Sequence, residues 1–264
     1  MAIVDIHTHI YPEKIAEKAT FSVGDFYNIE MRGMGTSEHL LSLVANSPIT
    51  HHVVHSVATT PKQVESINNF IAAECAAHPN FMGFATMHQD YENPEAEIDR
   101  CIALGLRGIK LHPDIQQVNL DDPRLMRVYE AGAARNLPFI IHTGDYRYDY
   151  SHPRRLVHVL HEFPTIVVDA AHFGGWSVFD LALEHLEDER CYVDVSSSLK
   201  FLGRRRTIEL IQAYGIDRVM FGADFPMWNP ANEYEVFRSL GFSEADYEKM
   251  CWRNAERFLN MEIN

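Results

Sequence analysis

The sequence predicts an α/β protein that folds as a closed (β/α)8 TIM barrel with a long loop insertion after its first strand. Its 264 residues suit one such barrel, so we expect a single domain spanning residues 1–264. Eight short runs of β-branched or apolar residues recur along the chain, and helix-like stretches separate most of them. Strands that alternate with helices pair in parallel through right-handed crossovers, and eight such units favour a closed barrel over an open sheet.

Each expected strand is a short apolar run between polar or turn-forming residues. The eight strands are Ala2–Ile6, Val53–Val57, Phe81–Thr86, Gly108–Leu111, Phe139–Ile141, Ile166–Ala171, Tyr192–Val195 and Val219–Gly222. The helical stretches carry apolar residues at helical spacing, and several begin with proline, which the first helical turn accepts. They are Ser37–Ala45, Lys62–His78, Pro94–Leu104, Pro123–Asn136, Pro153–Phe163, Val178–Glu187 and Arg204–Tyr214.

The segment from Tyr11 to Thr36 interrupts this alternation. It lies between the first strand and the first helix of the repeat, and it shows weak helical character only over Pro12–Ala19. A long loop on a compact barrel is more often functional than accidental. We therefore expect this loop to cover the mouth of the barrel.

Charge and composition exclude several kinds of partner. The chain has 37 acidic and 23 basic residues, a formal net charge of −14, whereas nucleic-acid-binding proteins concentrate Lys and Arg. No apolar run approaches the ~20 residues that span a bilayer, and the N-terminus lacks the pattern of a signal peptide. We expect no nucleic-acid or membrane partner and a cytoplasmic location. The four cysteines form no CxxC motif, which predicts buried, reduced thiols.

The first strand ends with two histidines, His7 and His9. Side chains alternate along a strand, so both imidazoles point to the same side. In a barrel that side is the interior, and the C-terminal ends of the strands form the catalytic face. Two imidazoles about 6–7 Å apart along the strand can converge on one metal ion.

Four later strands also end in polar side chains. The fourth strand ends with Lys110 and His112 on one face, the fifth with His142, the sixth with His172 and the eighth with Asp224. Polar groups at buried strand ends would each need a separate partner, whereas one shared metal ion satisfies several of them. The sequence therefore predicts a divalent metal centre at the barrel mouth.

Imidazole and carboxylate ligands suit zinc, with manganese as the alternative. Such an ion lowers the pKa of bound water toward about 7 and polarises a carbonyl group. The residues alone place Asp224 either to bind the metal or to take a proton from that water. They place His172 either on the metal or beside it as an acid/base.

An ordered set of motifs resembles the amidohydrolase superfamily, in its amidohydrolase-related branch around aminocarboxymuconate semialdehyde decarboxylase. The resemblance covers nearly the whole chain and implies the TIM-barrel fold, His7, His9, His142 and Asp224 as ligands of one divalent metal, and His172 as the catalytic acid/base. The motifs are DIHTHIYP, GIKLHPDIQ, PFIIHTGD, VDAAHFGG, FGADFPMW and the closing NAERFL helix.

Lys110 and His112 leave alternatives open. In binuclear members of the superfamily, such as dihydroorotase, a lysine on the fourth strand is carboxylated and bridges two metals, and KLHP resembles that segment. We favour instead a cationic Lys110 that neutralises Asp224 or binds a substrate carboxylate, because the decarboxylase branch does not usually carry a carboxylated lysine there. His112 is a metal ligand, a substrate contact or a polar strand end.

The substrate is expected to be a small anion. Arg147, in the loop after the fifth strand, is a candidate clamp for its carboxylate. Trp176 and Trp228 follow the sixth and eighth strands and could form walls of a planar pocket. A homo-oligomer is left open. The other histidines considered match no ligand position and are expected to be structural or on the surface: His51, His52, His55, His78, His152, His158, His161 and His185.

The leading function is a metal-dependent hydrolase that uses metal-activated water on a small-molecule amide, cyclic amide or lactone. The alternative is a metal-dependent non-oxidative decarboxylase of a small unsaturated or aromatic carboxylic acid. A related nuclease family is disfavoured because GIKLHP and FGADFP depart from its motifs. A Schiff-base aldolase that uses Lys110 and an inactive metal-binding barrel complete the alternatives.

Overall fold

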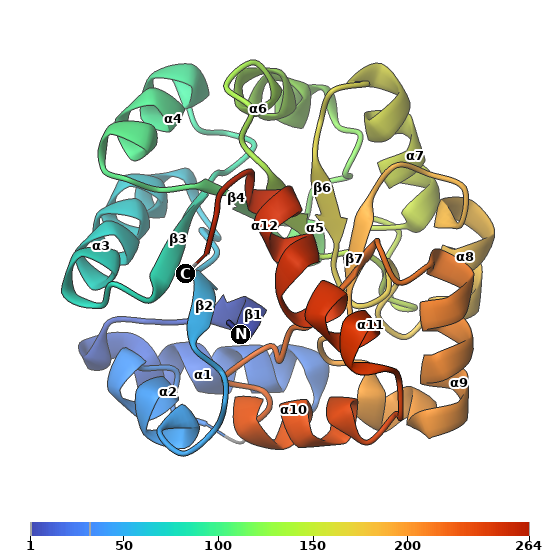
Figure 1. Ribbon diagram of the computed structural model, residues 1–264. Coiled ribbons are helices and arrows are strands. Elements are labelled where there is room, and N and C mark those ends of the chain that lie inside the picture. The colour runs from blue at the N-terminus through green and yellow to red at the C-terminus, as the bar shows by residue number, and fades with distance from the viewer. Residues whose placement is uncertain (1, 32, 264) are drawn as a thin grey trace.

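The computed structural model describes residues 2–31 and 33–263, and over these residues the predicted (β/α)8 barrel is confirmed. Eight strands pair in parallel in chain order, and helices surround them (Figure 1). A parallel bridge between Thr8 and Phe225 closes the barrel. The strands are β1 (Val4–His9), β2 (His51–His55), β3 (Phe81–Thr86), β4 (Gly108–Leu111), β5 (Phe139–Ile141), β6 (Val168–Ala170), β7 (Tyr192–Asp194) and β8 (Val219–Met220).

The helices that cover the strands begin where the sequence supplies a suitable first turn. Proline occupies that turn in α4, α6, α7 and α10, where its missing N–H costs nothing. The helical elements are α1 (Glu13–Tyr27), α2 (Ser37–Val44), η1 (Pro61–Gln63), α3 (Val64–Ala77), α4 (Pro94–Ala103), α5 (Pro113–Gln116), α6 (Pro123–Ala133), α7 (Pro153–Glu162), α8 (Phe179–Leu186), α9 (Leu199–Tyr214), α10 (Pro230–Arg238), α11 (Glu244–Glu248), η2 (Lys249–Arg253) and α12 (Asn254–Leu259).

Helix α12 closes the N-terminal end of the barrel, where Figure 1 shows it lying across the strands. Its Phe258 is buried and stacks on Phe84 of β3, with 6.1 Å between the ring centroids. Tyr192 of β7 packs edge to face on the Phe258 ring. This apolar plug leaves the opposite end, where the strands terminate, as the open end of the barrel.

The expected loop after the first strand is largely a helix. Helix α1 runs from Glu13 to Tyr27 and buries Ala16, Thr20 and Gly24, which are spaced four residues apart on one helix face. A β-carbon at Gly24 would lie 2.9 Å from the carbonyl oxygen of Ile29, so only glycine fits there. The segment does lie over the barrel mouth, as predicted, but as an ordered helix packed onto it.

The cysteines are reduced, and most of them are buried. All four cysteines are free thiols, as expected, and Cys101, Cys191 and Cys251 are buried, whereas Cys75 is only half-buried. Among the residues that the structure describes, no helix is both long and apolar enough to cross a membrane.

Candidate active site at the strand ends

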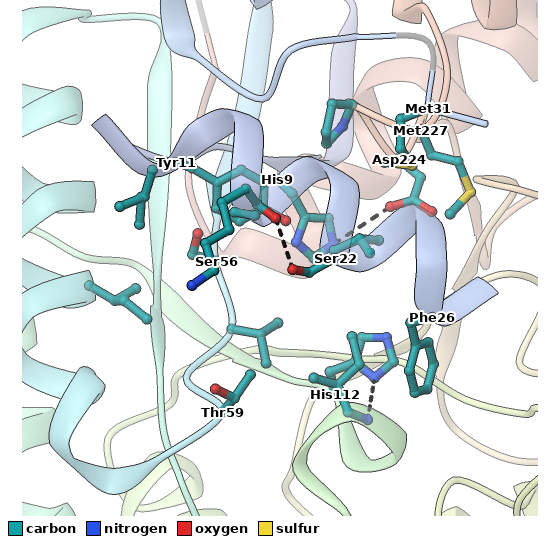
Figure 2. A pocket seen from close by; sticks show the side chains of 18 of the residues that line it. His9, Tyr11, Ser22, Phe26, Met31, Ser56, Thr59, His112, Asp224 and Met227 are labelled. Carbon is teal, nitrogen blue, oxygen red and sulfur yellow. Dashed lines mark hydrogen bonds and ion pairs between the residues drawn. The ribbon is translucent and has the colours of Figure 1, made fainter. Parts of the chain in front are cut away.

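A cavity of about 740 Å³ opens at the C-terminal ends of the strands. Its floor carries polar side chains from five strand ends: His7 and His9, His112, His142, His172 and Asp224. Helix α1 covers it, and Figure 2 shows Ser22 of that helix close to His9 and Phe26 beside His112. The barrel therefore brings together six of the residues that the sequence singled out.

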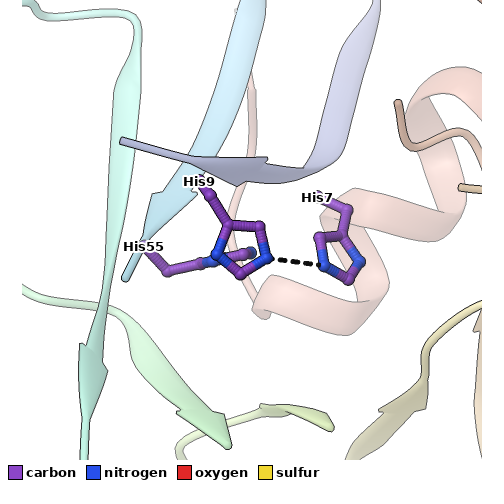
Figure 3. A group of neighbouring side chains, drawn as sticks. All are labelled: His7, His9 and His55. Atoms are coloured by element: carbon purple, nitrogen blue, oxygen red, sulfur yellow. Dashed lines mark hydrogen bonds between the residues drawn. The ribbon is translucent and has the colours of Figure 1, made fainter. Parts of the chain in front are cut away.

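His7, His9 and Asp224 form a compact group. The two Nε2 atoms of His7 and His9 are 3.3 Å apart (Figure 3), and Asp224 Oδ1 lies 3.6 Å from the first and 3.5 Å from the second. Ligands of a tetrahedral ion with bonds of about 2.0–2.1 Å lie roughly 3.3–3.4 Å apart. The spacing of these three atoms therefore fits a shared metal ion.

Hydrogen bonds to the outer ring nitrogens set the tautomers of three histidines. His7 Nδ1 donates to Asp194 Oδ2 at 2.8 Å, which leaves Nε2 with its lone pair. His142 Nε2 is 3.1 Å from the carbonyl oxygen of Gly144, and His172 Nδ1 is 2.9 Å from that of Ser196. Each of these imidazoles therefore turns an unprotonated nitrogen inward, as metal-binding histidines do.

His142 and His172 face each other through those inner nitrogens, which are 3.1 Å apart. Two lone pairs at this distance repel unless a proton or a cation lies between them. His142 also lies within ligand distance of His112 and Asp114, whose side-chain nitrogen and oxygen atoms lie within 4.8 Å of its own. The structure thus places His142 beside His172 and His112.

Burial disfavours the charged forms of His7, His9, His142 and Asp224. Burial, reinforced by the neighbouring Lys110, lowers the pKa of His7 and of His9 well below the ordinary value. Burial likewise lowers the pKa of His142, and the adjacent His112 adds to the effect. The pKa of Asp224 is raised by burial, against the hydrogen bond that its Oδ2 accepts from Ser197 at 2.5 Å.

Two site residues have an unusual backbone conformation. His172 (φ 61°) and Asp224 (φ 62°) lie in the left-handed region, which residues other than glycine rarely adopt. Such conformations cost about 1–3 kcal/mol each and persist where the surrounding structure enforces them. Here the turn after each strand aims the side chain into the cavity.

Lys110 lies beneath this group and is fully buried. Its Nζ donates to His7 Nε2 at 3.0 Å, and burial lowers its pKa to about 8, against the attraction of Asp224, Asp194 and Asp169. Among the described residues Lys110 is not part of the cavity lining. Its expected roles, a cation beside Asp224 or a carboxylated bridging ligand, stay predictions.

Two residues of this centre were not recognised in the sequence. His55 ends β2, and its ring packs edge to face on His9 with 4.4 Å between centroids (Figure 3). Neither of its ring nitrogens has a hydrogen-bond partner among the described residues. Asp194 ends β7 and receives hydrogen bonds from His7 and Ser196. Both carry the same signal as the recognised residues, a polar side chain that ends an apolar run.

Tyr27, on the last turn of α1, also enters the site unpredicted. Its hydroxyl oxygen is 2.7 Å from His112 Nε2 and 3.4 Å from His142 Nε2. Burial, with Asp224 as the next cause, raises its pKa well above the usual value, so it stays a neutral phenol. The rings of His112 and His142 stack at 3.9 Å, and Tyr27 caps this pair.

The three expected substrate contacts have different positions. Trp176 lines the cavity and packs edge to face on Tyr27 at 4.8 Å. Trp228 lies outside the lining formed by the described residues, because its Nε1 donates to Ser197 Oγ at 2.8 Å and its ring packs beneath Lys200.

Arg147 is not free to clamp a carboxylate in this structure. Its guanidinium donates to both carboxylate oxygens of Asp145, at 2.9 and 2.6 Å, and to the carbonyl oxygen of Phe26. It also lies over the Phe26 ring, 4.7 Å from the centroid. These contacts hold the C-terminal end of α1 against the loop after β5.

A closed barrel with histidines and an aspartate at its strand ends is the architecture of a metal-dependent amidohydrolase-type enzyme. The chain belongs to this class: residues 4–261 match the family model of the amidohydrolases, Amidohydro_2. The predicted superfamily is thereby confirmed, and the protein is an enzyme of that superfamily.

Curated relatives narrow the class further. A gamma-resorcylate decarboxylase from Polaromonas sp. (strain JS666) is 25% identical over 277 residues, which cover 86% of this chain and 84% of the relative. One from Rhodococcus jostii (strain RHA1) is 24% identical and covers 95% of this chain and 96% of the relative. A solved structure of 2,6-dihydroxybenzoate decarboxylase complexed with 2,6-dihydroxybenzoate has a TM-score of 0.76 at 18% identity, over 99% of this chain and 100% of that one.

These relatives correct the predicted reaction. The expectation of an amide or lactone hydrolase is wrong, because the curated relatives are decarboxylases, and the solved neighbours include further decarboxylases. The hydrolase expectation depended on a metal-activated water. The same ligand residues could hold a metal ion for either reaction, so the residue pattern alone could not separate hydrolysis from decarboxylation. A dihydroxybenzoic acid decarboxylase structure from Polaromonas sp. JS666, with a TM-score of 0.74 at 19% identity over 98% of this chain and 97% of that one, contains manganese and the inhibitor 2-nitroresorcinol.

Proposed function

We propose that this protein is a divalent-metal-dependent, non-oxidative decarboxylase of small aromatic carboxylic acids. The observation that carries the proposal is the inward convergence of unprotonated imidazole nitrogens and the Asp224 carboxylate on one cavity floor. The decarboxylases among its relatives support the reaction and the class of substrate.

The metal would be held by His7, His9, His142 and Asp224. The donor set fits manganese or zinc, since imidazole and carboxylate suit both. When bound, such an ion supplies Lewis-acid chemistry that orients an anionic substrate and stabilises charge on its oxygens. Asp194 and Gly144 orient His7 and His142 from behind through their outer nitrogens.

His172 is the proposed proton donor. Its Nδ1 donates to the carbonyl oxygen of Ser196, so His172 takes up and delivers the exchanged proton through Nε2, the nitrogen that faces the cavity. In the reaction that proton goes to the ring carbon that bears the carboxylate. The bond between that carbon and the carboxylate then breaks, its electron pair restores the aromatic ring, and carbon dioxide leaves. His172 regains its proton from solvent.

The cavity lining also suits an anionic substrate. Among the described lining residues Asp224 is the one carboxylate, while Lys14 and Lys18 of α1 lie at the outer edge. Positive groups at the mouth of a chain whose net charge is −14 attract small anions toward the site. Trp176 and Tyr27 offer flat apolar surfaces for an aromatic ring.

The experiment is a carbon dioxide release assay on the protein loaded with manganese or zinc, with 2,6-dihydroxybenzoate as the first substrate. We expect turnover that a chelator abolishes and that added metal restores. His172→Asn should retain the metal content of the wild type and lose about 10²-fold or more in kcat. His158→Asn, at an exposed surface position, is the control. Absence of carbon dioxide release across a panel of hydroxylated aromatic acids would refute the proposal.

A further inference from the structure

The cavity continues beyond the polar floor. It extends outward between α1 and the segment formed by η1 and the start of α3. Its volume of about 740 Å³ is large for one aromatic ring, because a cavity of about 150 Å³ already holds benzene. Pockets of roughly 300–1,000 Å³ are typical for ligands of drug size.

One wall of this outer part is an apolar stripe on α1. Ile15, Ala19 and Val23 are four residues apart, so they share one face of the helix. The stripe lies beside the one that packs onto the barrel, and it lines the cavity, with 45% of Ile15 exposed. An apolar face left open to a cavity is available to an apolar part of a ligand.

The facing wall comes from the second crossover. Ile67 and Phe70 on α3 line the cavity opposite α1, and both also contact the hydrophobic core, which holds them in place. Gln63 at the edge of this wall is already engaged, because its side-chain oxygen accepts hydrogen bonds from the backbone N–H groups of Thr59 and Thr60. The outer part is therefore bounded by apolar side chains on both sides.

We infer that the substrates are aromatic acids that carry an extended apolar substituent, such as an alkyl chain, on the side of the ring opposite the carboxylate. The carboxylate and its flanking oxygens face the polar floor, and the substituent lies between Ile15, Ala19 and Val23 on one side and Ile67 and Phe70 on the other. The inference rests on the proposed function for the position of the carboxylate.

The test measures binding separately from turnover. The metal-loaded protein is titrated calorimetrically with resorcinol, 5-methylresorcinol and 5-pentylresorcinol, which are ring products that need no reaction to bind. Each fully buried methylene is worth roughly a fourfold gain in affinity. For a partly buried pentyl group we expect the Kd to fall by about tenfold or more relative to resorcinol.

Two variants fill the outer part from opposite walls, Ala19→Trp on α1 and Ile67→Trp on α3. Each should remove the gain from the pentyl group and leave the Kd of resorcinol within about twofold. Glu17→Trp is the matched control, because Glu17 is an exposed residue of α1 that is not part of the cavity lining. It should leave the whole series unchanged.

Equal Kd values for resorcinol and 5-pentylresorcinol, no binding of either, or a gain that survives both tryptophan variants would overturn the inference. The same protein is assayed for carbon dioxide release from 2,6-dihydroxybenzoate and its 4-pentyl derivative. Release from the first acid without any gain for the pentyl compounds keeps the decarboxylase and rejects the apolar subsite. A gain in binding that both tryptophan variants abolish, with no release from either acid, supports the subsite and rejects decarboxylation.

Discussion

The Nδ1 atom of His7 lies 2.8 Å from Oδ2 of Asp194, and neither side chain is exposed to solvent. The carboxylate holds the imidazole in the tautomer whose Nε2 faces His9 and Asp224. Asp194 also receives the backbone N–H of His172, so one carboxylate positions residues of two strand ends. Such partners behind a ligand tune metal affinity without touching the metal.

We predict that Asp194→Asn weakens metal binding by about 10- to 100-fold. The amide keeps the shape of the side chain but loses the negative charge that favours the Nδ1 proton on His7. The metal Kd is measured by competition with a chromophoric chelator. Asp99→Asn, at an exposed acid on α4, serves as the control. Unchanged metal affinity in a correctly folded Asp194→Asn protein would show that the tautomer is set in another way.

Arg147 should act through α1 and not through direct substrate binding. Arg147→Gln removes the contacts with Asp145 and with the Phe26 carbonyl. We expect a loss of about 1–2 kcal/mol in stability, a fall of roughly 2–6 °C in Tm, and faster proteolysis within α1. Arg154→Gln is the control, since Arg154 pairs with Asp149 at an exposed site. A rise in KM with α1 as protease-resistant as in the wild type would favour the carboxylate clamp instead.

Tyr27→Phe tests the cap on His112. The change removes the hydroxyl that lies 2.7 Å from His112 Nε2 and leaves the ring on Trp176. Losing one hydrogen bond of about 0.5–1.5 kcal/mol should raise KM by roughly 2- to 12-fold and leave the metal content unchanged. Steady-state kinetics with metal analysis checks this, and Tyr146→Phe, at a side chain that is 73% exposed, is the control. A loss of metal in Tyr27→Phe would place the hydroxyl in the support of His142.

Much of the barrel could be predicted because each strand has a recognisable local sequence pattern. The bounds expected for β3, β4 and β5 are the observed ones, since each is an apolar run that a polar residue, glycine or proline ends. Helix α1 could not be predicted in full. Thr20 and Gly24 are poor helix formers in its interior, and the helix is stabilised by the barrel beneath it and by Arg147 at its end.

Site residues were missed for a related reason, because their positions depend on the exact ends of the strands and on how α1 packs. A prediction of β2 as Val53–Val57 placed His55 in mid-strand, whereas the strand begins at His51 and ends at His55, beside His9. Moving the predicted strand by two residues leaves His55 on the same face of the sheet. It moves His55 from the middle of the strand to its C-terminal end, where the site lies. Tyr27 could not be found at all, because only the folded position of α1 brings its hydroxyl to His112. The sequence ranked hydrolysis first and decarboxylation second because the two reactions use the same residue types at the strand ends.

The N-terminal cap of α7 should lose its stabilising effect on acidification. His152 caps α7, and its Nδ1 accepts the backbone N–H of Arg154 at 3.2 Å, which requires the neutral imidazole. Burial, with Arg154 as the next cause, lowers its pKa in the folded protein below the value of about 6.5 for the unfolded chain. A lowered histidine pKa means that the cap's contribution is present above about pH 6.5 and is lost as the pH falls below it.

His152→Asn should therefore reduce the loss of stability on acidification, because asparagine is a good cap that does not titrate. We expect a Tm close to that of the wild type at pH 7.5 and about 1–3 °C above it at pH 5.5, measured by circular dichroism. His152→Ala removes the cap at both pH values and should cost about 0.5–2 kcal/mol even at pH 7.5. If the wild type and His152→Asn lose Tm equally between the two pH values, protonation of His152 does not control the end of α7.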